Sequence, residues 1–266
     1  MKTAMTAILL VMASAGSAET LRDLCPERPG RGAPPCILDA GHIQYEAGLT
    51  DWTIDQSHGS RTDTLLIADS LVRFGVTDDT EAQIGWTPYG HVRTREPGGA
   101  VDRGGGTGDI TFAVRHSLRN PDGKDLSIAI EPFATLPTGG HAIGATSWSA
   151  GVIVPLSVEL PGHLQFAASP EIDAAADEER KGRHLAYAMA ASLTAPIGKS
   201  GVNASAELWS QRDNDPSDHT TQFSADFSAA WQPKQLANLQ LDVGTNIGLN
   251  RSTLDLEFYS GIAIRF

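Results

Sequence analysis

Hydrophobic and polar residues alternate along the last stretch of the chain, LDLEFYSGIAIRF (254–266). Successive side chains of a β-strand point to opposite faces, so this pattern predicts a strand with one apolar and one polar face. Asp255, Glu257 and Arg265 belong to the polar face. The apolar face carries Leu254, Leu256, Phe258, Ile262, Ile264 and Phe266.

The same period of two recurs through most of the chain, and helical periodicity is missing from end to end. The least regular segment is 64–75, where Leu65, Ile67 and Leu71 share a face with Asp69 and Arg73. We therefore predict an all-β fold of about twelve strands. The predicted strands are 42–50, 64–75, 81–90, 109–119, 126–136, 147–159, 163–173, 184–197, 202–210, 221–231, 239–250 and 254–266.

The connections between these strands alternate in length. TDD, NPDGK, LPG, GKSG and PKQLAN are tight turns, whereas the intervening connections include longer polar loops at 51–61, 92–108, 175–183 and 212–219. Short turns on one side and long loops on the other are typical of a transmembrane antiparallel up-and-down β-barrel, with periplasmic turns and extracellular loops. We predict that residues 41–266 form such a barrel in the outer membrane of a Gram-negative bacterium.

A soluble barrel or sandwich would instead turn its apolar face inward. The apolar face of the predicted strands carries almost no charge, as expected for contact with lipid, where Lys or Arg costs about 2–4 kcal/mol at the bilayer midplane. Aromatic residues near strand ends suit the girdles of a membrane barrel. They are Tyr45, Trp86, Trp148, Tyr187, Trp231 and Phe266.

The first residues resemble a secretory signal. Residues 1–18 combine a positive charge at Lys2, a short apolar run and small residues before a cleavage site, and we expect a mature chain from about Glu19. A membrane anchor would need about 20 apolar residues, roughly twice the length of this run. The formal net charge of −12 argues against binding to nucleic acid.

The only two cysteines lie in CPERPGRGAPPC, a segment rich in Pro and Gly. In an exported chain, this spacing predicts a disulfide between Cys25 and Cys36 rather than a redox pair or a metal site. Residues 19–40 are expected to form a periplasmic N-terminal segment, in which the disulfide loop is placed to plug or cap the mouth of the barrel.

The mature chain also resembles a family of outer-membrane transporters named for the MetA pathway of phenol degradation. The resemblance rests on the Cys- and Pro-rich start, on TGDITFAVRH (107–116) and on EPFATLPTGG (131–140). It implies uptake of small aromatic or other hydrophobic compounds. Phe266 resembles the C-terminal signal that the bacterial barrel-assembly machinery recognises, so we expect that machinery, outer-membrane lipid and lipopolysaccharide as partners.

The polar face of the predicted strands would line the lumen. Its carboxylates outnumber its arginines, which would favour cations over anions; alternatively, the charges pair across a narrow interior and fill it. The function is then a passive channel or, alternatively, a closed structural or adhesion barrel whose loops bind a partner. The lumen residues are Glu46, Asp69, Arg73, Arg115, Arg119, Glu131, Glu171, Asp173, Glu207, Asp226, Asp242, Asp255, Glu257 and Arg265.

No motif in the sequence indicates catalysis. GGGTGD (104–109) lacks the Lys-Ser/Thr of a phosphate loop and reads as a surface loop. The eight histidines show no metal-binding spacing, and no GxSxG occurs. Because barrel-embedded hydrolases exist, a pair such as His116 and Ser117 stays open. We predict no enzyme activity, no cofactor and no metal.

Overall fold

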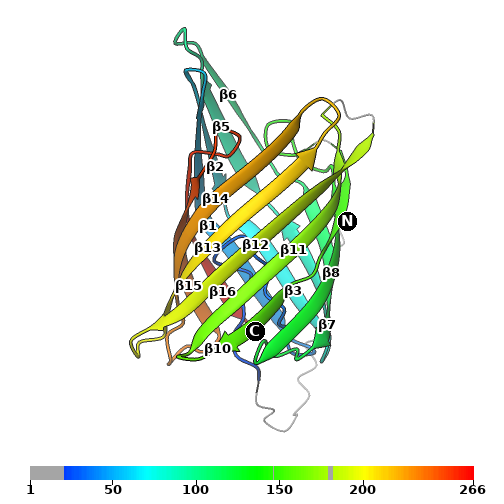
Figure 1. Cartoon of the computed structure of the whole chain (residues 1–266), viewed down its shortest axis with the longest axis vertical. Helices are drawn as coiled ribbons and strands as arrows, with labels where there is room; N and C mark the ends of the chain where they lie inside the picture. The colour runs from blue at the N-terminus through cyan, green and yellow to red at the C-terminus, as the bar shows by residue number, and fades with distance from the viewer. Residues whose placement is uncertain (1–20, 146, 179–181) are drawn as a thin grey trace, which may run out of the picture.

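A computed structural model describes residues 21–145, 147–178 and 182–266. The signal predicted at residues 1–18 lies outside these described residues. Each strand pairs antiparallel with its neighbours, and β1 (Ile43–Ser57) pairs with β16 (Leu256–Arg265) to close the sheet into a barrel (Figure 1). No helix in the described part of the chain is long and apolar enough to cross a membrane.

The barrel has twelve spans, because four of them are divided into two segments each: β2/β3, β4/β5, β6/β7 and β9/β10. Spans that are consecutive in sequence are neighbours in the sheet, so the predicted up-and-down barrel of about twelve strands is confirmed. The other segments are β2 (Ser60–Ile67), β3 (Asp69–Thr77), β4 (Thr80–Trp86), β5 (Tyr89–Arg95), β6 (Val101–Gly106), β7 (Ile110–Arg119), β8 (Leu126–Leu136), β9 (Ser149–Ile153), β10 (Leu156–Leu160), β11 (Leu164–Ala176), β12 (Arg183–Ile197), β13 (Val202–Asn214), β14 (His219–Trp231) and β15 (Leu239–Gly248).

The irregular segment 64–75 has a local cause. Ala68 has a φ of 57° and separates β2 from β3. Leu65 pairs with the outward-facing Trp52, whereas Arg73 is buried inside the barrel. The break therefore exchanges the two faces, so that residues of one parity point outward before Ala68 and inward after it.

The two faces of the barrel wall differ in polarity. On β14, Phe227 is 51% exposed and its neighbour Asp226 is 2% exposed; on β15, Val243 is 57% exposed and Asp242 is 3% exposed. The apolar side chains point away from the barrel and the polar side chains point into it. This arrangement is opposite to that of a soluble barrel and matches a wall surrounded by lipid.

Two predicted loops are wrong. Much of 51–61 and 92–108 consists of strands, because β1 runs on to Ser57 and because β5 and β6 form a hairpin that includes Gly104–Gly106 of the GGGTGD stretch. The alternation of Thr and Val with charged residues supports strands here, and Gly59 and Gly99, both with positive φ, supply the turns. These hairpins extend the wall at one side of the barrel (Figure 1).

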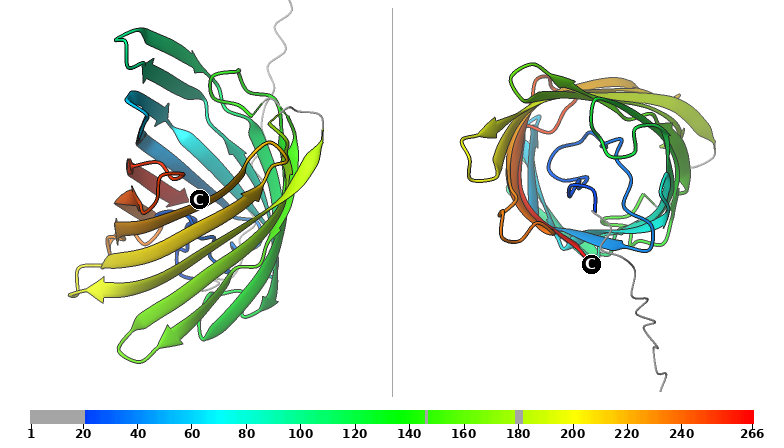
Figure 2. Two further views of the ribbon diagram at one scale, coloured as in Figure 1. Left: turned by 45° about the horizontal axis from the view of Figure 1, so that its top comes forward. Right: turned by 90° about the horizontal axis from the view of Figure 1, so that it is seen from below.

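Residues 21–40 lie within the ring of strands, as the view along the barrel shows (Figure 2, right). The amide of Leu38 donates to Glu81 of β4 over 2.6 Å, and Arg31 forms an ion pair with Glu257 of β16 at 2.8 Å. The sequence placed this segment on the periplasmic side. In the structure its contacts are with residues of the lumen wall.

Candidate functional site: the lumen and its strap

The predicted disulfide between Cys25 and Cys36 is present. It closes a loop of residues 25–36, which we call the strap. The strap contains one acidic side chain, Glu27, and two basic ones, Arg28 and Arg31. Its position inside the barrel places it between the walls of the lumen.

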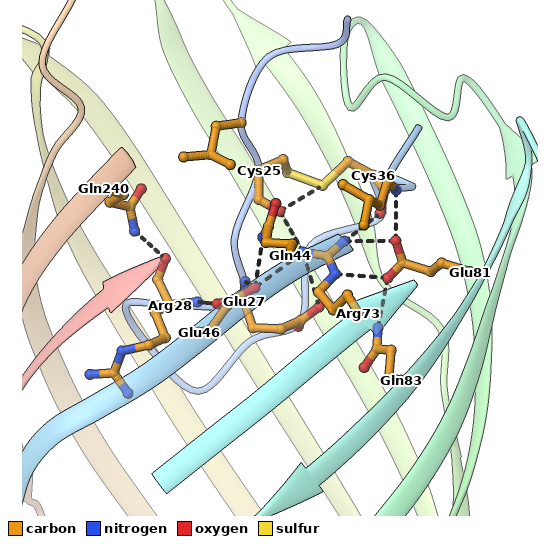
Figure 3. A network of polar contacts seen from close by, with 12 residues as sticks. Cys25, Glu27, Arg28, Cys36, Gln44, Glu46, Arg73, Glu81, Gln83 and Gln240 are labelled. Carbon is orange, nitrogen blue, oxygen red and sulfur yellow. Dashed lines mark hydrogen bonds and ion pairs between the residues drawn. A yellow bond between two sulfur atoms is a disulfide. The ribbon is translucent and has the colours of Figure 1, made fainter. Parts of the chain in front are cut away.

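One side of the lumen is filled by a buried network of charges (Figure 3). Arg73 of β3 binds Glu81 of β4 through Nε and an NH2 group, each at 2.9 Å, and lies 3.4 Å from Glu46 of β1. Arg115 of β7 lies 3.4 Å from Glu81 and donates through Nε to Glu131 of β8 at 2.6 Å. We call β1, β3, β4, β7 and β8 the arginine wall.

The arginine wall holds the base of the strap. Arg73 donates to the carbonyl oxygens of Cys25 and Cys36 over 2.6 and 3.3 Å. Arg115 forms an ion pair with Glu27 at 2.5 Å. The carboxylate of Glu46 accepts the backbone amides of Glu27 and Arg28 at 3.1 and 3.2 Å. Backbone and side-chain bonds thus anchor both ends of the disulfide loop to the same wall.

Opposite the arginine wall, four strands place polar residues in one row. Glu207 of β13 pairs in register with Asp226 of β14, Asp226 with Asn246 of β15, and Asn246 with Glu257 of β16. Carboxylates directly opposite each other repel. Arg31 of the strap compensates this acidic row, with ion pairs to Asp226 at 3.5 Å and to Glu257 at 2.8 Å.

The tip of the strap is bound by backbone amides as well. Glu207 accepts the amide of Arg31 at 2.8 Å and that of Gly32 at 3.3 Å. The guanidinium of Arg31 also lies 4.6 Å from the centre of the Trp209 ring, within the range of a cation–π contact. Glu207 is therefore the acceptor that latches the strap tip to β13.

Arg28 binds the lumen wall between the base of the strap, which the arginine wall holds, and its tip, which Glu207 holds. Its NH2 group donates to Asp242 of β15 at 3.0 Å, and its guanidinium lies 5.6 Å from the centre of the Tyr259 ring. A Cβ at Gly261 would overlap this guanidinium, so the absence of a side chain there permits the close approach. The strap thus directs its negative charge to the arginines and its positive charges to the carboxylates.

Small side chains line the strands beside the acidic row, which leaves room next to the strap. We call β11–β14 the small-residue wall. A cavity of about 700 Å³ opens on the side of the short turns, and a smaller one of about 110 Å³ lies along the strap tip. A third cavity, of about 310 Å³, lies on the other side of the strap, beside Glu46 and Asp69. The small side chains that line the first two are Ala167, Ser169, Ala190, Ser192, Thr194, Ser205 and Ser228.

The remaining residues of the predicted lumen set lie in several places. Asp69 is exposed at the third cavity, and Asp173 of β11 is buried next to Glu171. Arg265 is buried at the short-turn end, where it donates to Asn238. Two residues lie apart from the lumen contacts described above: Arg119 is exposed at the end of β7, and Asp255 is exposed before β16 and accepts the amide of Gln56 at 2.7 Å.

Sequence reasoning missed Glu81 and the three charged strap residues. Glu81 alternates with apolar Ala82 at the start of β4, so the period of two was the signal for it. The strap has no periodicity that could indicate its partners. The pair left open for hydrolysis is not assembled, since Ser117 is 9% exposed and faces inward, whereas His116 is exposed and contacts Thr80.

The fold brings together one group of metal-ligating side chains that the spacing did not predict. Donor atoms of Asp177, His184 and Asp215 lie within 4.8 Å of one another, near the ends of two hairpins. Hydrogen bonds from the hydroxyl and amide of Ser217 lower the pKa of Asp215 to about 2. Asp215 is therefore ionised beside His184, and the group ties the two hairpins together through ion pairs.

Solved structures with the same fold are outer-membrane proteins. The COG4313 outer membrane channel from Pseudomonas putida F1 is 13% identical, with a TM-score of 0.71 over 90% of this chain and 100% of that chain. The NanC porin is 12% identical, with a TM-score of 0.50 over 84% and 98% of the two chains. The β domain of the Bordetella autotransporter Brka is 12% identical, with a TM-score of 0.51 over 86% and 100%.

No curated protein sequence matches the chain. The fold of these structures and the outward apolar face agree with the predicted location in a Gram-negative outer membrane, which is confirmed. A family model, described as the putative MetA-pathway of phenol degradation, matches residues 27–266. The chain therefore belongs to that family of outer-membrane transporters, as the sequence predicted.

Proposed function

We propose that this protein is a passive channel that admits small solutes across the outer membrane through a lumen narrowed by the strap. The observation that carries the proposal is the asymmetric lumen: cavities of about 700 and 110 Å³ run along the strap on the side of the small residues, whereas the side with the buried charges keeps one of about 310 Å³. Passage past the strap requires movement only of its tip, because the small-residue wall leaves space there.

The charge of the lumen supports a preference for cations. Glu171 and Asp173 of β11 lack a basic partner among the ion pairs of the described residues, while both strap arginines are already paired with carboxylates. An acidic surplus within a low-dielectric wall attracts cations and repels anions. The description of the family supports small aromatic compounds as solutes, so we propose small neutral or cationic aromatics.

Planar-bilayer recording of the refolded barrel tests the channel. We expect discrete conductance with a reversal potential that indicates cation preference. Absence of conductance from barrel that shows heat-modifiable migration would reject the channel and favour the closed structural or adhesion barrel.

Liposome uptake of three matched aromatics tests the solute class. Tyramine, 4-hydroxybenzyl alcohol and 4-hydroxybenzoate are similar in size and differ in charge. We expect protein-dependent uptake, corrected for protein-free liposomes, to be fastest for the cation and slowest for the anion. Equal rates for all three would retain the channel and reject the acidic selectivity.

A further inference from the structure

The extension of the wall formed by β1, β2, β5 and β6 carries charges that the lumen does not explain. These strands project past the rest of the barrel at the end with the long connections (Figure 2, left). Asn and Gln are scarce on them, whereas arginine is frequent: Arg61, Arg93, Arg95 and Arg103 all lie here. In a chain with a formal net charge of −12, such a concentration calls for a physical reason.

The register of the strands shows which face these arginines occupy. Phe258, exposed on the outside of the barrel, is the partner of Trp52, and the two rings lie 6.3 Å apart. Trp52 pairs with Leu65, and Leu65 pairs with His91. Directly paired residues share a face, so alternate residues from Leu65 and from His91 also point outward.

All four arginines belong to this outward face. Arg61 pairs in register with Arg95, and Arg93 pairs with Arg103. The outward face of these four strands has one carboxylate, Asp63, which Arg61 binds through NH2 at 2.6 Å and which lies 3.7 Å from Arg93. No carboxylate in the described residues forms an ion pair with Arg95 or Arg103, and both are exposed. Four guanidinium groups therefore share one counter-charge.

The inward face of the same strands has a different character. Thr62 and Thr94 form a hydrogen bond to each other at 3.1 Å, and the glycines at 90 and 104 allow the loop residues Ile143 and Ala142 to approach closely. The basic character is therefore confined to the side of the extension that continues the lipid-facing surface, and the channel mouth does not share it.

The arginines lie above an aromatic girdle, close to the headgroup region of the outer leaflet. Trp86 and Tyr89 are outward and exposed below them, at the level of an aromatic girdle. Arg93 follows Tyr89 by four residues on β5, which is about 13 Å along a strand and about 10 Å in height at a tilt of about 40°. The polar region of one leaflet extends about 5–8 Å beyond the hydrocarbon, so the backbone of Arg93 lies just above that region and its long side chain can reach back into it.

We propose that this outward face binds the phosphate groups of the glycolipid in the outer leaflet, lipopolysaccharide. Guanidinium groups bind phosphate oxygens in bidentate fashion, and unpaired arginines above an aromatic girdle are placed to do so where the lipid headgroups lie. The adjacent pairs Arg61–Arg95 and Arg93–Arg103 would otherwise repel each other. Bound phosphate supplies the missing negative charge and fixes the extension against the membrane.

Binding to lipid A tests the proposal. Wild-type barrel is mixed with vesicles that contain phosphorylated lipid A, chemically dephosphorylated lipid A or phosphatidylcholine alone, and the lipid that copurifies after detergent extraction is quantified by mass spectrometry. We expect retention of phosphorylated lipid A only, with at least a tenfold loss in the variant R95Q/R103Q. These two arginines are chosen because neither pairs with Asp63.

A matched control is R212Q/R251Q, which removes two arginines from other extracellular parts of the chain. It should retain lipid A like the wild type, and inorganic phosphate at millimolar concentration should compete weakly, because the lipid presents several phosphates at once.

Equal retention by wild type and R95Q/R103Q, or equal retention of the two forms of lipid A, overturns the proposal. If R95Q/R103Q does not fold, the comparison of the two lipids on wild-type barrel decides. Conductance should be unchanged in every folded variant, so failure here leaves the channel function untouched.

Discussion

The two walls of the lumen share the same alternation of inward and outward side chains, but large inward side chains line one wall and small ones line the other. On the arginine wall, long charged side chains such as Arg73 and Arg115 are fully buried and occupy the space between the strands and the strap. On the small-residue wall, Ser205 and Ser228 face each other in register, and a cavity remains. We infer from this difference that side-chain size along one face, and not strand number alone, determines how much of the lumen the side chains fill.

The strap connects the two walls. It is anchored at its base to the arginine wall through Cys25 and Cys36, and its tip reaches the small-residue wall at Glu207. The tip is held by Glu207 and by the ion pairs of Arg31 with Asp226 and Glu257, so release of these contacts would let the tip move while the base keeps the strap in the lumen.

The largest expected effect is at the base. Replacing Arg73 with Met leaves Glu46 buried without its guanidinium partner and leaves Glu81 with Arg115 alone, and removal of one member of a buried ion pair costs about 3–5 kcal/mol. The free energy of unfolding in urea, followed by heat-modifiable migration, should fall by that amount. The control Ser205→Ala on the opposite wall should change it by less than about 0.5 kcal/mol. Equal losses in both variants would contradict the proposed division between the walls.

The next effect concerns the outside of the barrel. Ile262 pairs with the exposed Leu241 on the outward face, so Ile262→Arg places a charge in hydrocarbon at a cost of about 2–4 kcal/mol near the midplane. Assembled barrel in the outer-membrane fraction should decrease sharply. Glu257→Gln, on the inward face of the same strand, should assemble normally and shift the reversal potential away from cation preference. Normal assembly of Ile262→Arg would show that this face does not meet lipid.

These contrasts also show what the sequence can and cannot predict. A period of two is a local property, so it predicted the strands, their number and the polarity of the two faces. It does not indicate which residue lies opposite which: the contact of Arg73 with Glu81 depends on the register across one turn. A single residue with positive φ, Ala68, exchanged the faces within 64–75, and nothing in the local composition marks that change.

The strap was the least predictable part, for a related reason. Spacing and compartment predicted its disulfide, but its place in the lumen depends on partners far away in sequence. Arg28 binds Asp242, and Arg31 binds Glu257, across more than 200 residues. The proline- and glycine-rich strap has no alternation of polar and apolar residues that would define one of its faces. Only the charges that surround it in the closed barrel determine where Glu27, Arg28 and Arg31 lie.

A smaller effect is expected at the tip of the strap. Glu207→Gln keeps an acceptor but removes the charge that strengthens its bonds to the amides of Arg31 and Gly32, and hydrogen bonds to charged groups contribute about 1.5–3 kcal/mol. Single-channel recording should show a higher open probability, and the free energy of unfolding should fall by no more than about 1–2 kcal/mol, because a neutral acceptor remains. Thr194→Ser, on the neighbouring strand and without contact to these amides, is the control. An open probability equal to that of the wild type would refute the latch.

The smallest effect on stability is expected at the seam where β1 meets β16. Phe266 is 69% exposed, but its amide donates to the carbonyl of Ile43 at 2.8 Å and its carbonyl accepts the amide of Ile43 at 3.3 Å. Phe266→Ala keeps both backbone bonds, so the barrel refolded in detergent should be as stable as the wild type within about 1 kcal/mol.

Deletion of Phe266 removes both bonds as well, at about 0.5–1.5 kcal/mol each. In cells the two variants should behave alike if the assembly machinery recognises the terminal aromatic ring, and both should accumulate less barrel in the outer membrane. Pulse–chase fractionation measures how much of each variant accumulates in the outer membrane. Normal accumulation of Phe266→Ala with loss only in the deletion would assign the role of Phe266 to closing the seam between the two walls, and would remove the assembly signal from it.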